Sequence, residues 1–384
     1  MSVAPVRQLL AQAQLISAFD YAPGYVGLLS RGVRAIDRLH AAFARLATDL
    51  LPVRVVASPE LTEVETYRER YGASHDYQNV YALTTPSGRH VVRPDSLAEM
   101  VSQGAATPGT MLANPRPIFR ADTTSPSPLM RDKHLWGVVQ AVTVTDPTTC
   151  DAVLRDHAQL VTALHTEIRL PMLLVEAPPL RAHADRRYLS FCVTPNGRLW
   201  LTSTLYVLGR GLTDPMGGTG PVVELGFTAK LLALAVAAHS DAVGPLLPCA
   251  LSHEQVVSAG EGRPWEGLVR RARREGLPFV VAPDSSAPDA RVAYVRAQDR
   301  FVPADSLLAD VAGAARAHDD VLWRRAVAAT EGVLDDPKAS AAWGAAPRGD
   351  DDYVLGTVTS ANFDRGTRAA GLGHVLLSHK HRLY

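Results

Sequence analysis

The stretch Ile118-Phe119-Arg120-Ala121-Asp122, followed after a short gap by Leu129-Met130-Arg131-Asp132-Lys133-His134-Leu135-Trp136, decides how this chain is interpreted. Its first part is typical of a β-strand that carries an arginine, and a loop rich in serine and proline over residues 123–128 separates the two parts. The apolar run 137–145 is typical of a strand that returns antiparallel. The sequence therefore predicts a hairpin that presents two arginines, Arg120 on the strand and Arg131 at the end of the loop.

Two guanidinium groups at such a place are suited to phosphate chemistry, because each can donate two parallel hydrogen bonds to anionic oxygens. An ordinary hairpin with surface arginines is the alternative interpretation. The layout resembles motif 2 of class II aminoacyl-tRNA synthetases. In that family the first arginine holds the α-phosphate of ATP and the loop arginine reaches the outer phosphates.

Further segments, in the same order along the chain, resemble the archaeal and eukaryotic type of prolyl-tRNA synthetase. Residues 21–32 are similar to the segment that leads into the motif 1 helix, and residues 92–100 take the place of the Arg-Pro-Thr-Ser-Glu turn. Residues 199–212 are similar to the Gln-x-x-Thr-Ser-His-x-Leu-Gly strand, and residues 226–232 are similar to motif 3. The resemblance implies an α+β fold, with a class II antiparallel-sheet core and a reduced α/β domain like the anticodon-binding one.

Composition limits the function classes. The chain has 384 residues, 47% of them hydrophobic, and equal numbers of basic and acidic residues, so no global field attracts nucleic acid or a membrane surface. Its three cysteines form no Cys-x-x-Cys pair, which excludes a disulfide framework and a cysteine zinc site. The longest apolar run, residues 231–238, is far shorter than the ~20 residues of a membrane span. We expect a cytoplasmic protein that contacts no membrane and holds no structural metal.

Three regions are expected from the pattern of apolar residues. Residues 1–243 form the synthetase-like core, with amphipathic helices over 31–50 and 150–168 and a buried helix over 227–239. Residues 244–335 form the α/β domain, which is abbreviated after Asp284 relative to the family. Residues 336–384 are rich in alanine, glycine and aspartate at their start and are expected to be a loop and a tail.

The nucleotide-binding residues are carried over from the resemblance. Arg120, Arg131 and Lys230 would hold ATP with its Mg²⁺, Lys230 standing in for the motif 3 arginine without its planar fork. Arg120 and Asp122 would be the catalytic pair, Asp122 being shorter than the motif 2 glutamate. An unpaired lysine in an otherwise apolar helix must face a cavity or an anion. The basic run 270–274 is read first as a solvated helix face and only second as a tRNA contact.

The substrate pocket departs further from the family. The residues that the resemblance implies for it are Asp95, Leu97, His134, Val139, Leu201, Thr204 and Tyr206. Asp95 and Leu97 replace the threonine and glutamate that hold proline's ammonium group, and Tyr206 replaces the histidine beside the proline ring. Asp95 is either a new ammonium partner or the N-cap of a helix that starts near residue 96. His134 is either a hydrogen-bonded cleft histidine or a base. Proline is therefore not the expected substrate.

Two functions stay open at this point. The first is an ATP-dependent adenylate-forming ligase that activates a small amino or carboxylic acid in specialised metabolism. The second is a pseudoenzyme that keeps the core to bind a metabolite or partner, in the manner of the histidine-biosynthesis regulatory subunit that resembles histidyl-tRNA synthetase. Either would be a homodimer formed through residues 31–57, and binding of tRNA is doubtful. The retained Arg120, Arg131 and Lys230 favour the ligase.

Overall fold

The fold is that of a computed structural model in which part of the chain is described. The described residues are 5–71, 80–121, 123, 126–177, 183–194, 199–240, 245–252, 256–259, 279–282, 292–295, 300–303, 311–334, 353–357 and 375–377.

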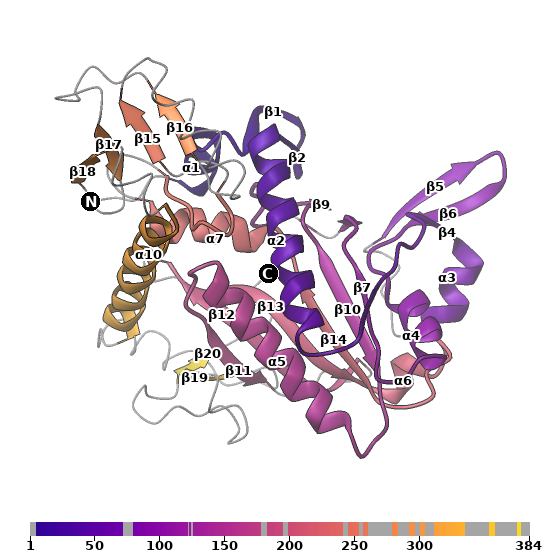
Figure 1. The fold of residues 1–384 in the computed structure, drawn as a ribbon. Helices are drawn as coiled ribbons and strands as arrows, with labels where there is room; N and C mark the ends of the chain where they lie inside the picture. The colour runs from indigo at the N-terminus through magenta and orange to yellow at the C-terminus, as the bar shows by residue number, and fades with distance from the viewer. Residues whose placement is uncertain are drawn as a thin grey trace.

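A large twisted sheet organises the described residues (Figure 1). Its strand order is β20-β19-β11-β12-β13-β14-β10-β7-β3. The bounds are β3 Val53–Val55, β7 Met111–Asn114, β10 Val139–Val144, β11 Leu173–Ala177, β12 Ala184–Val193, β13 Leu199–Leu208, β14 Val222–Phe227, β19 Tyr353–Thr357 and β20 Val375–Leu377. The pairs are antiparallel, apart from the parallel pair of β3 and β7 at the edge. The predicted α+β class with an antiparallel-sheet core is confirmed.

Helices α2 (Ser30–Thr48), α5 (Cys150–Glu167) and α7 (Lys230–His239) cover one face of this sheet (Figure 1). The short helix α1 (Val6–Gln12) packs against α7. The hairpin of β1 (Ile16–Ala22) and β2 (Tyr25–Leu28) packs against α1 and α2. In α2, Ile36, Leu39 and Phe43 recur at helical spacing and are buried against the sheet. The expected helices over 31–50 and 150–168 are thus present with slightly different ends.

A smaller layer packs on the opposite face. It consists of α4 (Leu97–Ala105), α3 (Val64–Tyr71), α6 (Arg210–Thr213) and the three-stranded sheet of β4 (Leu61–Glu63), β6 (Gly88–Val92) and β5 (Tyr81–Thr85), most of which projects to the right in Figure 1. Val101 and Met100 of α4 are fully buried and pack against Leu112 and Val142 of the large sheet. The large sheet therefore carries a core on each face.

The expected helix over 227–239 starts later than predicted. Residues 222–227 form β14, which is paired on both sides, and the helix begins at Lys230. Val222, Val223 and Phe227 suit a central strand because β-branched and aromatic side chains pack well on a pleated surface. The Thr228 hydroxyl then accepts a hydrogen bond from the Lys230 N–H at 3.1 Å. Lys230 is thus the first residue of α7 and not an interior one.

The C-terminal region contains a second, mixed sheet of order β16-β15-β17-β18. Its strands are β15 Val256–Ala259, β16 Phe279–Ala282, β17 Val292–Val295 and β18 Arg300–Pro303. Helix α10 (Val311–Leu334) follows and contacts α7 and β12 of the core. The basic run 270–274 and the residues 285–291, where the domain was expected to be abbreviated, lie outside the described residues.

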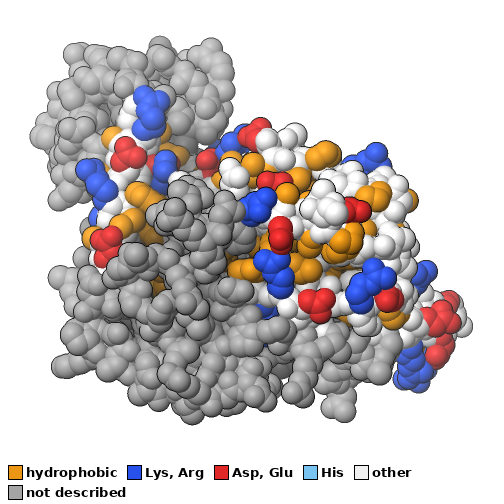
Figure 2. All heavy atoms as spheres, turned by 90° about the horizontal axis from the view of Figure 1, so that it is seen from below, with side chains coloured by type: hydrophobic (Ala, Val, Ile, Leu, Met, Phe, Trp, Pro, Cys, Tyr) orange, Lys and Arg blue, Asp and Glu red, His pale blue; other side chains and the backbone are white. Residues whose placement is uncertain are grey.

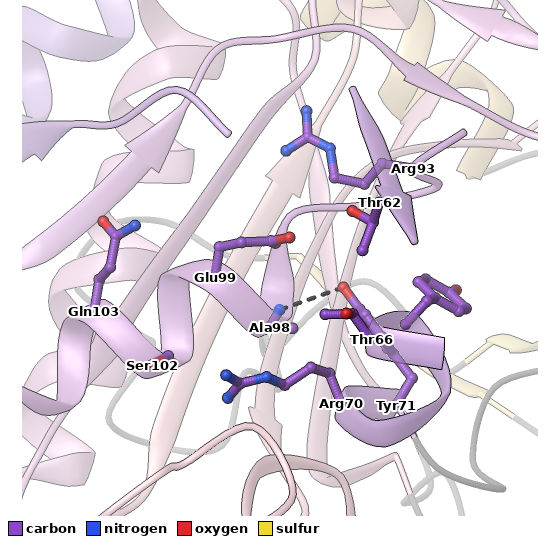
Figure 3. Close-up of a pocket in the computed structure, with 10 residues that line it drawn as sticks. Thr62, Thr66, Arg70, Tyr71, Arg93, Ala98, Glu99, Ser102 and Gln103 are labelled. Atoms are coloured by element: carbon purple, nitrogen blue, oxygen red, sulfur yellow. Dashed lines mark hydrogen bonds between the residues drawn. The ribbon is translucent and has the colours of Figure 1, made fainter. Parts of the chain in front are cut away.

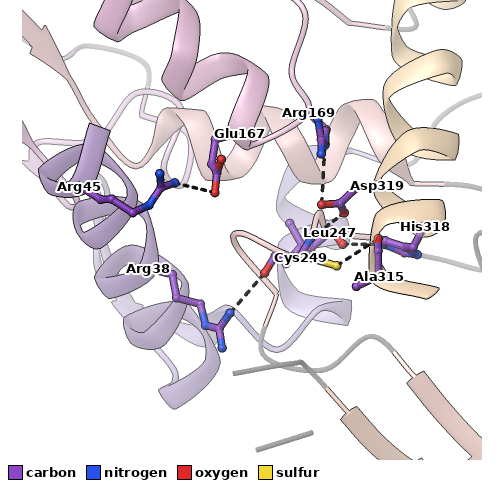
Figure 4. A network of polar contacts seen from close by, with 9 residues as sticks. All are labelled: Arg38, Arg45, Glu167, Arg169, Leu247, Cys249, Ala315, His318 and Asp319. Atoms are coloured by element: carbon purple, nitrogen blue, oxygen red, sulfur yellow. Dashed lines mark hydrogen bonds and ion pairs between the residues drawn. The ribbon is translucent and has the colours of Figure 1, made fainter. Parts of the chain in front are cut away.

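Polar contacts attach α10 to the core (Figure 4). Asp319 accepts a hydrogen bond from the Cys249 N–H at 2.9 Å and lies 3.6 Å from the guanidinium of Arg169, at the end of α5. His318 hydrogen-bonds to the Leu247 carbonyl at 3.1 Å. Because these partners come from two separate segments, residues 247–249 and the end of α5, the long helix is held to the core on its polar side.

The last region is not only a loop and tail. β19 pairs with β11 and β20 pairs with β19, so residues 353–357 and 375–377 extend the large sheet. Without them, β11 would present a row of unpaired backbone groups at the sheet edge. The predicted boundary at residue 336 therefore does not mark the end of the large sheet, because strands on both sides of it belong to that sheet.

Among the residues that the structure describes, no helix combines the length and the apolar character that a membrane crossing requires.

Candidate active site

Strand registers arrange the candidate site on the face of the sheet that α3 and α4 cover. Two adjacent rows of residues run across strands β7, β10, β14 and β13. The first row is Asn114, Gln140, Gly226 and Thr204, and the second is Leu112, Val142, Glu224 and Tyr206. Side chains alternate between faces along a strand, so these eight positions point to the same side. The first row is polar, and Glu224 is the carboxylate of the second.

Gly226 leaves a gap in the middle of the first row. A Cβ atom there would lie 3.2 Å from the Thr204 hydroxyl oxygen on the neighbouring strand. Thr204 itself is half-buried. Because Gly226 has no side chain, the surface of the sheet is lower between Gln140 and Thr204 than on either side. This low floor at Gly226 leaves room for a bound group to approach the backbone.

Gln140 joins the sheet to the turn that precedes α4. Its amide nitrogen donates to a Glu224 carboxylate oxygen at 2.8 Å, and its amide oxygen accepts from the Ser96 N–H at 2.6 Å. The Ser96 hydroxyl in turn accepts from the Asn114 amide at 2.6 Å and from the Arg93 guanidinium at 2.7 Å. All of these groups are buried, so the network fixes how the turn lies on the sheet.

Asp95 makes two kinds of contact at this turn, one with a side chain and one with the backbone. Its carboxylate accepts hydrogen bonds from the Tyr71 hydroxyl and, at 3.0 Å, from the Leu97 N–H. It therefore satisfies a backbone donor at the start of α4, although Ser96 is the N-cap residue. The same carboxylate is close enough to Glu224 for its charge to raise the pKa of that residue. The capping and the ligand-binding interpretations of Asp95 are thus compatible.

Glu224 is the most perturbed acid of the site. Burial raises its pKa from 4.5 to about 7, and the charge of Asp95 adds to the increase, while the hydrogen bond from Gln140 and the positive charge of Arg120 oppose it. Asp95, Arg120 and Glu224 come from three distant parts of the sequence and meet here. Two neighbouring buried carboxylates favour a proton or a cation between them.

This pKa predicts a pH dependence of stability. Because the folded-state pKa of Glu224 lies above its ordinary value, the residue contributes stability that is complete below pH 4.5 and is lost as the pH rises through about 7. Glu224→Gln should abolish this loss, which amounts to about 3 kcal/mol. Urea unfolding of both proteins from pH 4.5 to 8 measures it as the difference between two curves. Parallel curves over that range would contradict the raised pKa.

A second cationic group lies around Lys230, next to Cys192 of the core on the α7 side of the sheet. Burial lowers the pKa of Lys230 to about 8, the neighbouring Cys192 thiol opposes the decrease, and the positive charge of Arg131 adds to it. Lys230 is also the first residue of α7, where backbone N–H groups favour an anion. Two neighbouring cations at a helix N-terminus are suited to a polyphosphate. The charges of Arg131 and Lys230 act on each other, and the charge of Arg120 acts on Glu224. The convergence of all three cations on one cleft stays a prediction.

The hairpin that carries the arginines is shorter than expected. β8 (Ile118–Phe119) pairs with β9 (His134–Leu135), and the Arg120 N–H donates to the Lys133 carbonyl at 2.7 Å. The apolar strand after it, β10, belongs to the large sheet and not to the hairpin. Arg131 ends the loop, where its N–H donates to the Ser127 carbonyl at 2.8 Å. Asp122, the predicted second catalytic residue, lies outside the described residues.

His134 lies in an aromatic stack and not on an open surface. Its ring centroid is 4.6 Å from that of Phe119 and 4.1 Å from that of Trp136. Burial lowers its pKa, so the neutral ring is favoured. Its Nε2 atom is buried and makes no hydrogen bond within the described part of the chain. His134 thus lies between the rings of Phe119 and Trp136, and Phe119 directly precedes Arg120 in the chain.

Three predicted substrate residues are core residues. Val139 is 1% exposed and packs with α2 and α7 on the opposite face of the sheet, so its assignment to the site is corrected. A shift of one residue along a strand reverses the face, and its neighbour Gln140 is the residue that reaches the site. The side chains of Leu97 and Leu201 lie in the apolar cluster of the α4 side, and Tyr206 borders both this cluster and Glu224.

Sequence reasoning missed Gln140, Glu224, Ser96 and Arg93. Gln140 and Glu224 each lie in a mostly apolar run. These runs are Val-Gln-Ala-Val-Thr-Val over 139–144 and Val-Val-Glu-Leu-Gly-Phe over 222–227. A charged side chain is rarely buried unless it is paired, so Glu224 in such a run was a detectable signal. It was overlooked because the adjoining residues were assigned to a helix.

The charges of the cationic residues are complementary to the phosphates of a nucleotide, whereas few side chains could serve as ligands for Mg²⁺. Arg120, Arg131 and Lys230 would contact phosphate oxygens. Within the described ranges, no group of three or more His, Cys, Asp or Glu residues could hold a metal ion. Mg²⁺ commonly retains water and binds through substrate phosphates with one or two carboxylates. It would therefore enter with ATP and not at a preformed protein site.

Comparisons with solved structures identify the fold. The model matches the prolyl-tRNA synthetase of Giardia lamblia in complex with prolyl-adenylate, with a TM-score of 0.71 and 14% identity over 83% of this chain and 80% of that one. It also matches the prolyl-tRNA synthetase of Cryptosporidium parvum with halofuginone and AMPPNP, with a TM-score of 0.68 and 14% identity over 85% and 78%. The same enzyme with L-proline and AMP gives a TM-score of 0.66 and 14% identity over 84% and 80%.

No protein-family model matches the sequence, and neither does any curated protein. An identity of 14% shows the fold and not the substrate. The expected resemblance is confirmed at that level: the chain has the class II fold of prolyl-tRNA synthetases.

Proposed function

We propose that this protein is an ATP-dependent, adenylate-forming ligase that activates an amino acid other than proline. The observation that carries the proposal is that the charges of Asp95 and Arg120 both act on the buried Glu224, on the α3 and α4 side of a sheet with the class II fold. The three neighbouring synthetase structures contain prolyl-adenylate, an ATP analogue, or proline with AMP in this fold. A buried carboxylate pair suits the ammonium group of an amino acid, and the neighbouring arginine suits a phosphate.

The ammonium group of the substrate would lie between Asp95 and Glu224. A cation there would offset both the burial and the charge of Asp95, which together raise the pKa of Glu224. Gln140 holds the Glu224 carboxylate in place, and the Tyr71 hydroxyl holds that of Asp95. The low floor at Gly226 would admit the substrate backbone, and Tyr206 would limit the size of its side chain.

The reaction requires that a carboxylate oxygen of the acid attack the α-phosphorus of ATP. An oxygen–phosphorus bond forms, the bond from the α-phosphorus to the bridging oxygen breaks, and pyrophosphate leaves. Arg120 would donate to the α-phosphate oxygens as negative charge accumulates there. Arg131 and Lys230 would hold the outer phosphates and then the departing pyrophosphate. Mg²⁺ bound to the phosphates would neutralise part of their charge.

An ATP–pyrophosphate exchange screen over single amino acids tests the proposal. We expect exchange with at least one amino acid and none above background with proline. Exchange should require the free carboxyl group, so the matching amino-acid amide is the control. Absence of exchange with every acid, together with absence of ATP binding by calorimetry, would exclude a ligase and favour the pseudoenzyme interpretation.

Prolylation of bulk tRNA should be undetectable. The residues that would hold proline are changed at Asp95 and Leu97, and the loss of one buried polar partner costs about 1–3 kcal/mol. On the face drawn in Figure 2, basic and acidic side chains of the described residues are mixed and form no single basic patch. An aminoacylation assay with labelled proline measures this. Formation of prolyl-tRNA would restore an ordinary synthetase function.

A homodimer through β1, α2 and β3 is part of the proposal. Large apolar side chains are exposed there, namely Phe19 at 64%, Tyr21 at 72%, Leu29 at 41%, Val33 at 45% and Val55 at 67%. Val55 also lies on the edge strand of the large sheet. An apolar surface of this kind is typical of a protein interface.

The double variant Val33→Asp/Val55→Asp should dissociate the dimer, because it places charges in an apolar contact. We expect the dissociation constant to rise about 30-fold or more, as measured by analytical ultracentrifugation. Leu83→Asp changes an equally exposed leucine on β5 and is the matched control. A wild-type protein that is monomeric at micromolar concentration would contradict this prediction.

A further inference from the structure

A separate cavity of about 260 Å³ lies between α3, β4 and α4 (Figure 3). Tyr67 is one of its lining residues. In Figure 3, Thr62 and Tyr71 lie on one side of the cavity, Glu99 lies on the other, and Arg93 lies at its upper end. None of Arg120, Gln140 or Glu224 lines it. The cavity is smaller than the ~300–1,000 Å³ of pockets for drug-sized ligands, so an occupant would be a small metabolite.

Arg93 provides an unused anion receptor at this cavity. The residue is 2% exposed, and its Nη1 atom donates to the Ser96 hydroxyl at 2.7 Å. Its Nε and Nη2 atoms are buried and have no hydrogen-bond partner among the described residues. These two N–H groups form one edge of the guanidinium fork, which is the geometry that binds a carboxylate through two parallel hydrogen bonds. Glu99 lies near enough for the charge of Arg93 to act on it, but these two buried donors stay unsatisfied, so a bound anion would stabilise them.

Glu99 provides the opposite charge. Its Oε2 atom is buried and makes no hydrogen bond in the described part of the structure. In Figure 3 its carboxylate points from α4 towards Thr62 and Arg93. No ion pair of 4.0 Å or less joins Glu99 to Arg93 or to the neighbouring Arg70 within the described residues. Acceptor and donor thus face one cavity without satisfying each other.

We propose that this cavity binds a free amino acid as a zwitterion, separately from the proposed substrate site. The carboxylate of the ligand lies on the Nε and Nη2 edge of Arg93, and its ammonium group lies on Glu99. The stacked rings of Tyr67 and Tyr71, with centroids 4.5 Å apart, give the cavity an apolar wall for a short side chain. A ligand with both charges satisfies both orphaned groups, whereas a simple anion leaves Glu99 unsatisfied.

Occupancy of the cavity acts on the turn that carries Asp95. Tyr71 lines the cavity, donates its hydroxyl hydrogen to Asp95 and accepts the Ala98 N–H at 3.3 Å. Arg93 holds Ser96, whose N–H is bonded to Gln140. A ligand that orders Arg93 and Tyr71 therefore also orders residues 95–98. Two sites linked in this way affect each other's affinity reciprocally.

Calorimetric titration with the standard amino acids, one at a time, tests the inference on the full chain. We use Glu224→Gln so that the proposed substrate site is impaired. At least one amino acid should still bind, and its methyl ester and its N-acetyl derivative should not. Adding Glu99→Gln or Ser102→Phe, which fills the cavity rim, should weaken binding about ten- to a hundredfold. Glu69→Gln, an exposed glutamate of α3 outside the cavity lining, is the matched control and should leave the affinity unchanged.

Amide exchange gives a second readout, because binding should slow exchange in the peptide that contains Leu97 and Ala98. The inference is overturned if no amino acid binds to Glu224→Gln, or if Glu99→Gln and Ser102→Phe leave binding intact. Binding that Glu224→Gln abolishes would leave the proposed function standing and remove only the second site. If binding depends on Glu99 but no amino acid supports exchange, the second site stands and the proposed function is removed.

Discussion

Glu224→Gln is expected to lower the rate of amino-acid-dependent ATP–pyrophosphate exchange by about 30- to 1,000-fold. The substitution keeps the shape and the hydrogen bond from Gln140 but removes the charge that would pair with the ammonium group. Loss of one partner of a buried charge pair costs about 2–4 kcal/mol. The effect should fall mainly on kcat/KM for the amino acid and leave the affinity for ATP within a few-fold. Steady-state exchange with each substrate varied in turn measures this.

The wild-type rate should also rise with pH through the pKa of Glu224, since only the ionised form attracts an ammonium group. Glu65→Gln, at a solvent-exposed glutamate on α3, is the control and should be neutral. If Glu224→Gln retains full activity, the buried carboxylate is a structural group and the ammonium site lies elsewhere. Unchanged unfolding behaviour near pH 5 would show that the variant is folded.

Arg120→Ala is expected to lower kcat by about 100- to 1,000-fold. A group that stabilises developing charge on the α-phosphate acts most strongly in the transition state, and removal of one such donor costs about this much. Arg120→Lys should recover part of the rate, because it keeps the charge but loses the second parallel hydrogen bond. Burst and steady-state measurements of pyrophosphate release would separate the chemical step from product release.

The same substitution has a structural consequence that can be checked independently of activity. The charge of Arg120 lowers the pKa of Glu224, so Arg120→Ala should shift the Glu224 pKa further upwards. Carbon-detected NMR of the glutamate carboxyl groups would follow this titration. Arg68→Ala, at an exposed arginine that forms an ion pair with Glu65, serves as the control for loss of a positive charge. An unaltered Glu224 titration would mean that Arg120 points away from the site.

The local pattern of residues was sufficient to predict the elements that bury only one face. The spacing of Ile36, Leu39 and Phe43 predicted α2, and the resemblance to class II synthetases implied an antiparallel core. It was not sufficient at 222–230, where a continuous apolar run suits both a buried strand and a buried helix. Pairing of β14 with a neighbour on each side decided for the strand.

The sequence by itself determined the class of the fold, the hairpin with Arg120 and the turn with Asp95. Only the tertiary structure decided which residues form the site. A strand exposes alternate residues to opposite faces, so register selected Gln140 over Val139 and brought Glu224 beside Asp95. Burial and neighbouring charge then set the pKa values of Glu224 and Lys230, and neither quantity exists in a sequence before residues far apart in the chain come together.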